Sequence, residues 1–376
     1  MEPGSALLSR WLAVFFVPTL VILPLSPAPS AQNALRLLAI VFGGWFLSLA
    51  TTAAVVTALS PGTPAVDSPA PGTPSKAPAV FKKRKIQTLG IGAALAGVTS
   101  ILTFGSMRTV LGFSLGKLAL PTRQISLLFA TLFGFSAGTR MPKSLRKAVH
   151  PVVTCTTVAI TTAALIGRGC AVSFADMLRS YVTKSRCPVH LGAGDLLLGL
   201  LAPSVLSFAV QMYRRRVLIF KNAKPVAGGT IFCAASGLFG TAAASRLIGL
   251  PNALRLAAIP RNITSPLALA ICSILGADAS LAIAIVVCTG VIGANFGATA
   301  LDAMGVTNPA ARGLAQGGSA HGLGTAAIVD ETTSFAFSAV AMALTATAST
   351  VLVSIPAVRT ALLTVALGSS GLVVTP

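Results

Sequence analysis

The side chains best suited to chemistry in this sequence lie in two segments that prolines interrupt. Residues 260–266 (PRNITSP) place a cation, an amide and two hydroxyls directly before an apolar helix. In residues 201–207 (LAPSVLS), Pro203 removes a backbone hydrogen bond inside a candidate membrane span. Such interrupted segments in two halves of a membrane chain indicate a transporter binding site, because half-helix N-termini direct positive dipole ends at an anion. Two ordinary proline kinks would leave the same pattern, so both interpretations stay open here.

A third polar segment, residues 310–326, is rich in glycine, which permits close approach of the backbone. Its hydrogen-bonding side chains are Gln316, Ser319, His321 and Thr325. Polar groups are costly in lipid, so this segment is expected to line a cavity or a protein interface. His321 titrates near neutral pH and is a candidate to carry a coupled proton, with a purely structural hydrogen bond as the alternative.

Two more polar residues interrupt apolar stretches. Asn295, within residues 293–297 (GANFG), is expected to be a buried amide that either joins two helices or contacts a substrate. Asp195 is the one acidic residue that opens a long apolar run, which makes it the second candidate for proton coupling.

No motif in the sequence indicates an enzyme. It contains no HExxH, no GxSxG, no P-loop and no GxGxxG after a strand. The six cysteines form no CxxC pair and no metal-ligand spacing. We therefore predict no catalytic residues, no cofactor and no metal site.

The composition predicts a membrane protein. Of 376 residues, 54% are apolar and only 10% are charged, and the mean hydropathy is +0.84, whereas soluble domains carry about 25% charged residues. The 28 Lys and Arg outnumber the 8 Asp and Glu, but they lie between apolar blocks, as the positive-inside rule expects. Without a nucleic-acid-binding motif, this basic excess does not indicate a nucleic-acid partner.

Apolar stretches of membrane-spanning length recur along the chain. The clearest cover 35–60, 86–106, 194–213, 226–250, 279–303 and 333–355. Shorter candidates cover 11–25, 124–139 and 149–167, and broken pieces cover 109–120, 169–180, 252–275 and 309–329. The expected fold is thus an all-α polytopic membrane protein with about ten transmembrane helices and additional broken or re-entrant segments. An inverted repeat in the C-terminal unit is left open.

Residues 61–80 are mostly Pro, Ala, Gly, Ser and Thr and cannot bury enough surface to fold alone. They precede the basic run 82–85. We expect a two-helix unit over 1–60, a Pro-rich basic linker over 61–85, and a larger unit over 86–376. Residues 1–30 show no cleavable targeting segment, so either none is needed or the sequence starts late.

Residues from about 124 to 365 resemble the LrgB/CidB membrane family, and particularly its plastid branch. The matching stretches are 194–199 (GDLLLG) with 206–209 (LSFA), 260–264 (PRNIT) with 267–269 (LAL), 289–296 (TGVIGANF), 308–313 (NPAARG), 319–327 (SAHGLGTAA) and 354–359 (SIPAVR). Residues 11–60 resemble the last two helices of the LrgA-type unit that plastid members carry ahead of the linker.

The resemblance implies a secondary transporter that exchanges small 2-hydroxycarboxylates, glycolate and glycerate, across the plastid inner envelope in photorespiration. Another organelle or the plasma membrane is the alternative location, and a homo-oligomer is left open. Bacterial members suggest a rival function, a holin-like membrane pore or regulator of lysis.

In a carrier that works by alternating access, the polar residues named above are expected to bind the substrate or to carry a coupled proton. Those expected to hold the carboxylate are Ser204, Arg261, Asn262 and Ser265, with helices starting at the two serines. Those expected to hydrogen-bond the substrate hydroxyl are Asn295, Ser319 and Thr325. His321 is counted among the substrate-binding residues and, with Asp195, among the proton-coupling candidates.

Overall fold

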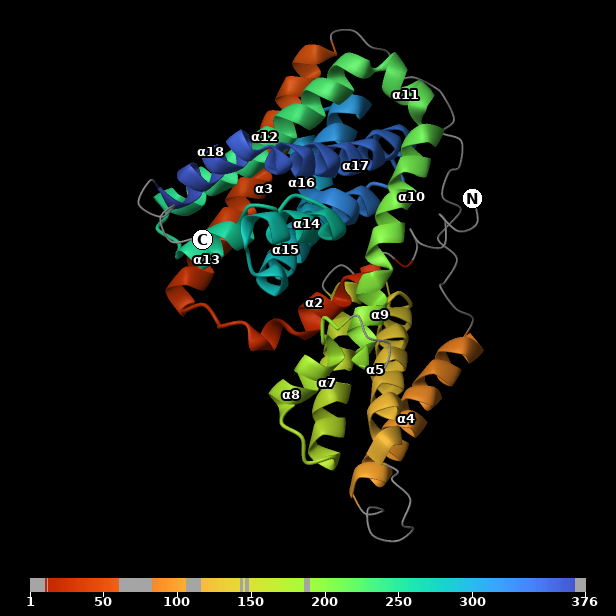
Figure 1. Cartoon of the computed structure of the whole chain (residues 1–376). Coiled ribbons are helices and arrows are strands. Elements are labelled where there is room, and N and C mark those ends of the chain that lie inside the picture. The colour runs from red at the N-terminus through yellow and green to blue at the C-terminus, as the bar shows by residue number, and fades with distance from the viewer. Residues whose placement is uncertain are drawn as a thin grey trace. The chain divides into compact units, whose positions relative to one another are not determined.

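The computed structural model describes residues 11, 13–60, 83–105, 116–142, 145, 149–185 and 190–368 (Figure 1). Within these ranges every regular element is a helix, so the expected all-α fold is confirmed. Residues 61–82 of the linker expected over 61–85 lie outside the described residues, whereas residues 83–85 are helical.

The helices form two compact units, each with its own internal packing. The first takes the described parts of residues 1–27 and 74–207, and the second takes those of 28–73 and 208–376. The helix that precedes the linker in sequence therefore packs with the C-terminal helices. The division by composition and resemblance, into 1–60, 61–85 and 86–376, stays a prediction.

In the first unit three long helices pack in sequence order, α4 on α5 and α5 on α7. Short helices surround α7, and the hydroxyl groups of Tyr181 and Thr131 lie 2.8 Å apart in the buried interior. The elements are α2 (Val17–Val21), η1 (Leu23–Leu25), α4 (Lys83–Gly105), α5 (Gly116–Gly138), α7 (Pro151–Gly169), α8 (Phe174–Tyr181) and α9 (Ala193–Gly199). α10 (Leu201–Arg214) contains the boundary between the units.

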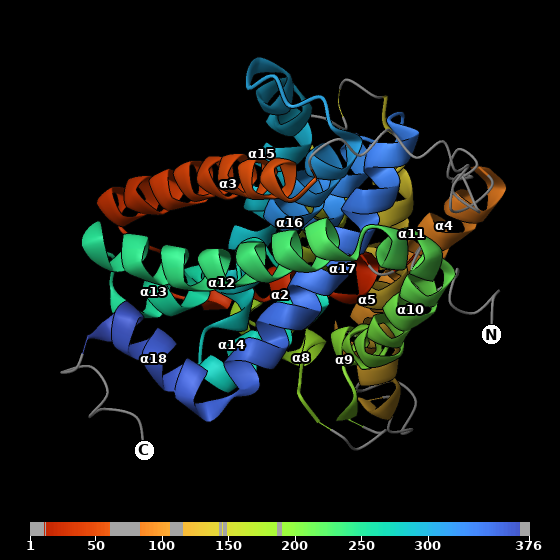
Figure 2. The same cartoon turned by 90° about the horizontal axis from the view of Figure 1, so that it is seen from above.

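In the second unit α3 (Ala31–Leu59) packs against both α12 (Ala223–Leu247) and α16 (Pro309–Ala327). Figure 2 shows α3 and α12 running side by side. α16 in turn packs between α15 and α17. The remaining elements are α11 (Arg216–Lys221), α13 (Asn252–Ala258), α14 (Ser265–Leu275), α15 (Ala279–Ala303), α17 (Thr332–Ser354) and α18 (Pro356–Leu367).

Helix ends in this unit follow local sequence signals. Asp278 caps α15 by accepting a hydrogen bond from the backbone N–H of Leu281 at 2.9 Å. Asn308 caps α16 in the same way, and Pro309 occupies the first helical position, where no N–H partner is needed. Gly276 ends α14 with φ 66°, a left-handed conformation that glycine adopts without steric cost.

Five of the described helices are long and apolar enough to cross a membrane, judged by length and composition: α3, α7, α12, α15 and α17. The spans predicted at 226–250, 279–303 and 333–355 agree with the observed helices to within a few residues.

The single helix predicted over 194–213 is divided at Leu200 into α9 and α10, although Leu200 keeps helical φ and ψ of −81° and −6°. α10 begins at Leu201 and not at Ser204, so Pro203 lies in the first helical turn. There its missing N–H costs nothing, since the first backbone donors of a helix have no intrahelical partner.

Candidate functional site

The site begins at the bend between α13 and α14. Ile259 keeps helical φ and ψ of −51° and −50°, but Pro260 after it has no N–H with which to continue α13, and Pro266 is tolerated in the first turn of α14. Residues 259–264 are therefore not part of either helix, and all of them are buried. α14 begins at Ser265, as expected from the sequence.

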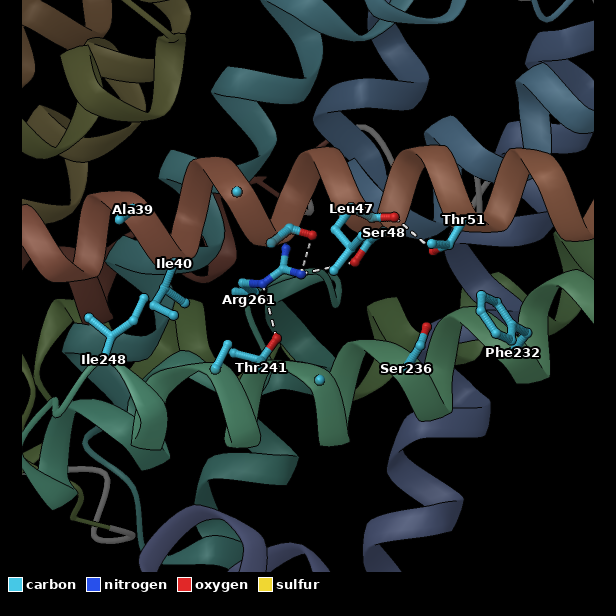
Figure 3. A pocket seen from close by; sticks show the side chains of 14 residues that line it. Ala39, Ile40, Leu47, Ser48, Thr51, Phe232, Ser236, Thr241, Ile248 and Arg261 are labelled. Carbon is cyan, nitrogen blue, oxygen red and sulfur yellow. Dashed lines mark hydrogen bonds between the residues drawn. The ribbon is translucent and has the colours of Figure 1, made fainter. Parts of the chain in front are cut away.

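Arg261 projects from this bend into the second unit, where it is 2% exposed. Its Nε donates to Thr241 Oγ1 at 3.0 Å, and Nη2 donates to Gly44 O at 2.6 Å and to Ser48 Oγ at 2.9 Å (Figure 3). A guanidinium has five N–H groups, so these bonds leave the two on Nη1, which is buried and has no hydrogen-bond partner.

No carboxylate in the described part of the chain pairs with this cation. The ion pairs there are Arg179 with Asp176, and Arg312 with both Asp302 and Glu331. A buried charge is strongly disfavoured unless an opposite charge or several hydrogen bonds compensate it. Three neutral hydrogen bonds hold Arg261 in place, and Nη1 remains able to bind an anion.

A groove of about 360 Å³ lies between α3 and α12, with Arg261 in its lining. This volume is within the range of small-molecule pockets. Ser48, Thr51, Ser236 and Thr241 supply hydroxyl groups, while the rest of the lining is apolar (Figure 3). Ser48 and Thr241 accept from Arg261, so each keeps its own hydroxyl proton for a second acceptor.

A second break lies within α16, at His321, whose φ of 43° and ψ of −140° interrupt the helix. His321 is 5% exposed, and its Nε2 lies 2.9 Å from the carbonyl oxygen of Val286. Because a carbonyl only accepts, Nε2 carries the proton of this bond, and in the neutral ring Nδ1 is an acceptor. The expected interruption at the glycine-rich segment is thus located at the histidine itself.

The two breaks are joined by a direct hydrogen bond. Asn262 Nδ2 donates to the carbonyl oxygen of Gly318 at 3.3 Å, three residues before His321. The other amide atom, Asn262 Oδ1, is buried and has no hydrogen-bond partner. Gln316 is similar: its Nε2 donates to Gly293 O and Gly324 O, and its buried Oε1 has no partner.

Glycines on the facing helices make room for these polar side chains. A Cβ at Gly44 would lie 2.8 Å from three guanidinium atoms of Arg261, closer than carbon contacts allow. An added Cβ would lie at least as close to the facing side chain at three other glycines: Gly237 faces Asn262, Gly290 faces His321, and Gly297 faces Gln316. The small residues of α3, α12 and α15 therefore accommodate a polar interior.

The other predicted residues of this unit have mainly structural contacts. Ser319 Oγ donates to Ala315 O at 2.7 Å, and Thr325 Oγ1 donates to His321 O at 2.8 Å. Ser265 is buried at the start of α14. All three lie near the breaks, and their contact with a substrate stays a prediction.

Asn295 was expected to be buried, and that expectation is wrong, because its side chain is exposed. The glycines that face α16 fix the inward side of α15 at Gly290, Gly293 and Gly297. Asn295 follows Gly293 by two residues, about 200° around a helix of 3.6 residues per turn, and so points away. Its role as a substrate contact remains untested.

Ser204 and Asp195 belong to the first unit, whereas the other candidates belong to the second. Ser204 Oγ donates to Leu200 O at 2.6 Å. The Asp195 carboxylate accepts from the backbone N–H groups of Thr183, Lys184 and Gly192 and from the Thr183 hydroxyl. Partial burial, the largest influence, raises the pKa of Asp195, but the hydrogen bonds together hold it below its ordinary value. This geometry is typical of a structural carboxylate, and proton coupling through Asp195 stays a prediction.

Sequence reasoning missed two parts of this region. The first is α3, which supplies Gly44 and Ser48, four residues apart on one helix face. The second is an ion-pair cluster in which Arg312 bonds Glu331 at 2.7 Å and Asp302 at 2.7 Å. Arg312 also holds the pKa of Glu331 below its ordinary range.

The fold and the site define a class: a multi-pass helical membrane protein with a buried, unpaired cation beside two broken helices. The model of the LrgB-like family matches residues 131–358, more than half of the chain. The chain belongs to this family.

Two relatives illustrate its range. The chain is 36% identical over 369 residues to plastidal glycolate/glycerate translocator 1, chloroplastic, of Arabidopsis thaliana. The aligned region covers 97% of the chain and 69% of the relative. It is 27% identical over 136 residues to the uncharacterized protein YxaC of Bacillus subtilis (strain 168), covering 36% of the chain and 59% of the relative. No solved structure matches the chain.

Proposed function

We propose that the chain is a secondary carrier that exchanges small 2-hydroxycarboxylates, glycolate and glycerate, by alternating access. The observation that carries the proposal is Arg261, a buried cation with two unused N–H groups and no carboxylate partner among the described residues. The name of the Arabidopsis relative supports the transporter role and the substrates. The chain is a transporter and not an enzyme.

The carboxylate binds at Nη1 of Arg261, because Nε and Nη2 are already engaged. The protons of the Ser48 and Thr241 hydroxyls add two donors beside it. In the present conformation the guanidinium is 2% exposed, so a substrate reaches it only when the helices around the groove move apart. Such a movement is the opening step that alternating access requires.

The remaining predicted residues act on the other end of the substrate or on coupling. Asn262, Ser265, Ser319 and Thr325 lie around the two breaks and hydrogen-bond the substrate hydroxyl or help to hold the carboxylate. His321 carries the coupled proton. Ser204, Asn295 and Asp195 keep the roles proposed from the sequence. Of all the candidates, these three have the contacts that least favour such roles.

The proposal includes the finer organisation of the molecule. About ten transmembrane helices cross the bilayer, with the five long apolar helices supplemented by shorter and broken ones. The C-terminal unit contains an inverted repeat, and the carrier forms a homo-oligomer in the plastid inner envelope. The parts 1–60, 61–85 and 86–376 are an LrgA-like remnant, a linker and an LrgB-like transport domain.

The test uses the purified full chain in liposomes loaded with glycerate, with uptake of labelled glycolate as the readout. Arg261→Gln removes both free N–H groups, and hydrogen bonds to a charged group are worth about 1.5–3 kcal/mol each, so affinity is expected to fall at least tenfold. Arg261→Lys retains the charge but not the fixed fork, and it is expected to recover only part of the loss.

Arg246→Gln is the matched control, since Arg246 lies in the last turn of α12, which forms one wall of the groove, is exposed, and bonds the backbone carbonyls of Thr364 and Val365. Wild-type exchange by a correctly inserted Arg261→Gln variant would remove Arg261 from the site. Unsaturable leak of a neutral sugar through the wild-type protein would favour the holin-like pore instead.

A further inference from the structure

The groove between α3 and α12 is better matched to an apolar chain than to a substrate as small as glycolate. Its walls include Ile40 and Leu47 from α3, and Phe232 and Ala244 from α12, with Ile248 at one end. Glycolate has a single methylene group between its carboxylate and its hydroxyl, so it leaves these walls uncovered. A ligand that enters the groove from water gains about 25 cal/mol for each Å² of its own apolar surface that these walls bury.

The charge of the groove restricts the occupant further. Arg261 is the one charged residue in its lining, and the Ser48 and Thr241 hydroxyls flank the guanidinium. One cation compensates one carboxylate, and a second carboxylate on the same ligand would lie against apolar walls without a partner. The chemistry therefore fits an anion that is charged at one end only.

Open space lies beside both walls, next to the residues that bond Arg261. A Cβ built at Gly43 of α3 or at Gly240 of α12 would meet nothing within 4 Å, although both residues line the groove. Side chains therefore do not fill the groove at these two positions, and a ligand chain can pass beside them.

The setting of the groove also suits an apolar chain. α3 and α12 are both long and apolar enough to cross a membrane. Leu47, which lines the groove, is 62% exposed, and Leu247 near the end of α12 is 87% exposed. Apolar side chains on the outer face of helices of spanning length are what contact with lipid requires.

We propose that this groove, once the helices around it have moved apart, binds a medium-chain monocarboxylate, with the carboxylate at Nη1 of Arg261 and the alkyl chain along the apolar walls of α3 and α12. The proposal rests on the proposed function only in taking Arg261 as the anion anchor. It adds a ligand class, medium-chain acids, that competes with the small substrate for the same cation.

The test measures binding, not transport, on the full chain in nanodiscs of uncharged lipid. Dissociation constants for butanoate, hexanoate and octanoate are obtained from ligand-induced shifts in the unfolding temperature. Burying a methylene group is worth about 0.8 kcal/mol, so the dissociation constant is expected to fall about fourfold per methylene until the chain outgrows the groove. Alkyltrimethylammonium ions of equal length are expected to give no saturable shift, because their charge opposes that of Arg261.

Two variants that fill the open space isolate the contribution of the groove. Gly240→Leu and Gly43→Leu each add a side chain whose Cβ meets no atom within 4 Å, and each is expected to flatten the chain-length dependence. Gly199→Leu is the control, because Gly199 in α9 also has nothing within 4 Å but does not line the groove. Partitioning of the acids into lipid is the same for all variants, so only the groove can change the slope.

Equal chain-length slopes in the wild type and in both groove-filling variants would overturn the proposal, as would equal binding of the trimethylammonium series. The proposal would be supported if Arg261→Gln lost carboxylate binding and if the dissociation constants of Gly240→Leu did not depend on chain length. Because no transport is measured, these results stand apart from the exchange assay. Binding that strengthens with alkyl-chain length, without glycolate exchange, would refute the carrier and leave the inference intact. Glycolate exchange without any dependence of binding on alkyl-chain length would refute the inference and leave the carrier intact.

Discussion

Gly44→Ala tests how α3 positions the guanidinium of Arg261. The new Cβ would lie 2.8 Å from Cζ, Nε and Nη2, whereas carbon contacts are normally about 3.5–4.0 Å. The guanidinium must therefore move by roughly 1 Å. That movement weakens its bonds to Gly44 O and Ser48 Oγ, which measure 2.6 and 2.9 Å.

The magnitude follows from these two bonds. Hydrogen bonds to a charged group are worth about 1.5–3 kcal/mol each. Loss of one of these bonds misplaces the guanidinium, and the same free energy corresponds to a fall of about ten- to hundredfold in substrate affinity. Alanine is favoured over glycine inside a helix by about 1 kcal/mol, which offsets part of the strain. Gly44→Ala is thus expected to raise KM strongly while changing the free energy of unfolding little.

The assay combines glycolate exchange in liposomes, measured over a range of substrate concentrations, with thermal unfolding of the same preparations. Gly43→Ala is the matched control, because it gains the same helix propensity and its Cβ meets nothing within 4 Å. Its KM is expected to stay within about twofold of wild type, given that exposed substitutions without contacts have small effects. A wild-type KM in Gly44→Ala would refute the argument that α3 holds the cation in place.

Two further predictions concern the ends of α16 and its interruption. Glu331→Gln removes the negative charge that accepts two hydrogen bonds from Arg312 and leaves one acceptor oxygen, so it is expected to lower the unfolding free energy by about 1–3 kcal/mol at neutral pH. Because Arg312 lowers the pKa of Glu331 from 4.5, this contribution is present above pH 4.5 and is lost as the pH falls through the lower folded value. Thermal unfolding of wild type and variant should therefore converge in acid, and a constant difference would contradict the ion pair. His321→Ala is expected to abolish exchange while membrane insertion stays intact. His321→Gly is expected to unfold at a higher temperature than His321→Ala, because φ of 43° suits glycine; exchange at the wild-type rate by either variant would exclude His321 from the mechanism.

Local signals in the sequence predicted most of the helices and one of the breaks. Pro260 and Pro266 act on their own backbone, so the bend at 259–264 could be placed without knowledge of any partner. Hydropathy likewise located α12, α15 and α17, because each must match the thickness of a bilayer. Segments whose conformation is set by neighbouring residues are readable from sequence.

Long-range neighbours were not predictable in this way. The bonds from Arg261 to Gly44 and Ser48 span more than 200 residues, and no periodicity links these positions. The exposure of Asn295 was within reach, since Gly290, Gly293 and Gly297 recur at helical spacing and mark the inward face. The apolar character of α15 as a whole concealed that its two sides differ.

The bend at 259–264 links the anion site to the break in α16. Arg261 and Asn262 are adjacent in the chain, so a backbone shift of the bend when a carboxylate binds would move both side chains. Asn262 holds the carbonyl of Gly318, and His321 follows three residues later in a conformation that costs free energy for any residue but glycine. Neutralising the buried charge of Arg261 removes the main electrostatic penalty in the same bend. In the proposed carrier, substrate binding at Arg261 would be coupled to the conformation of α16 through this hydrogen bond, the kind of contact that alternating access changes.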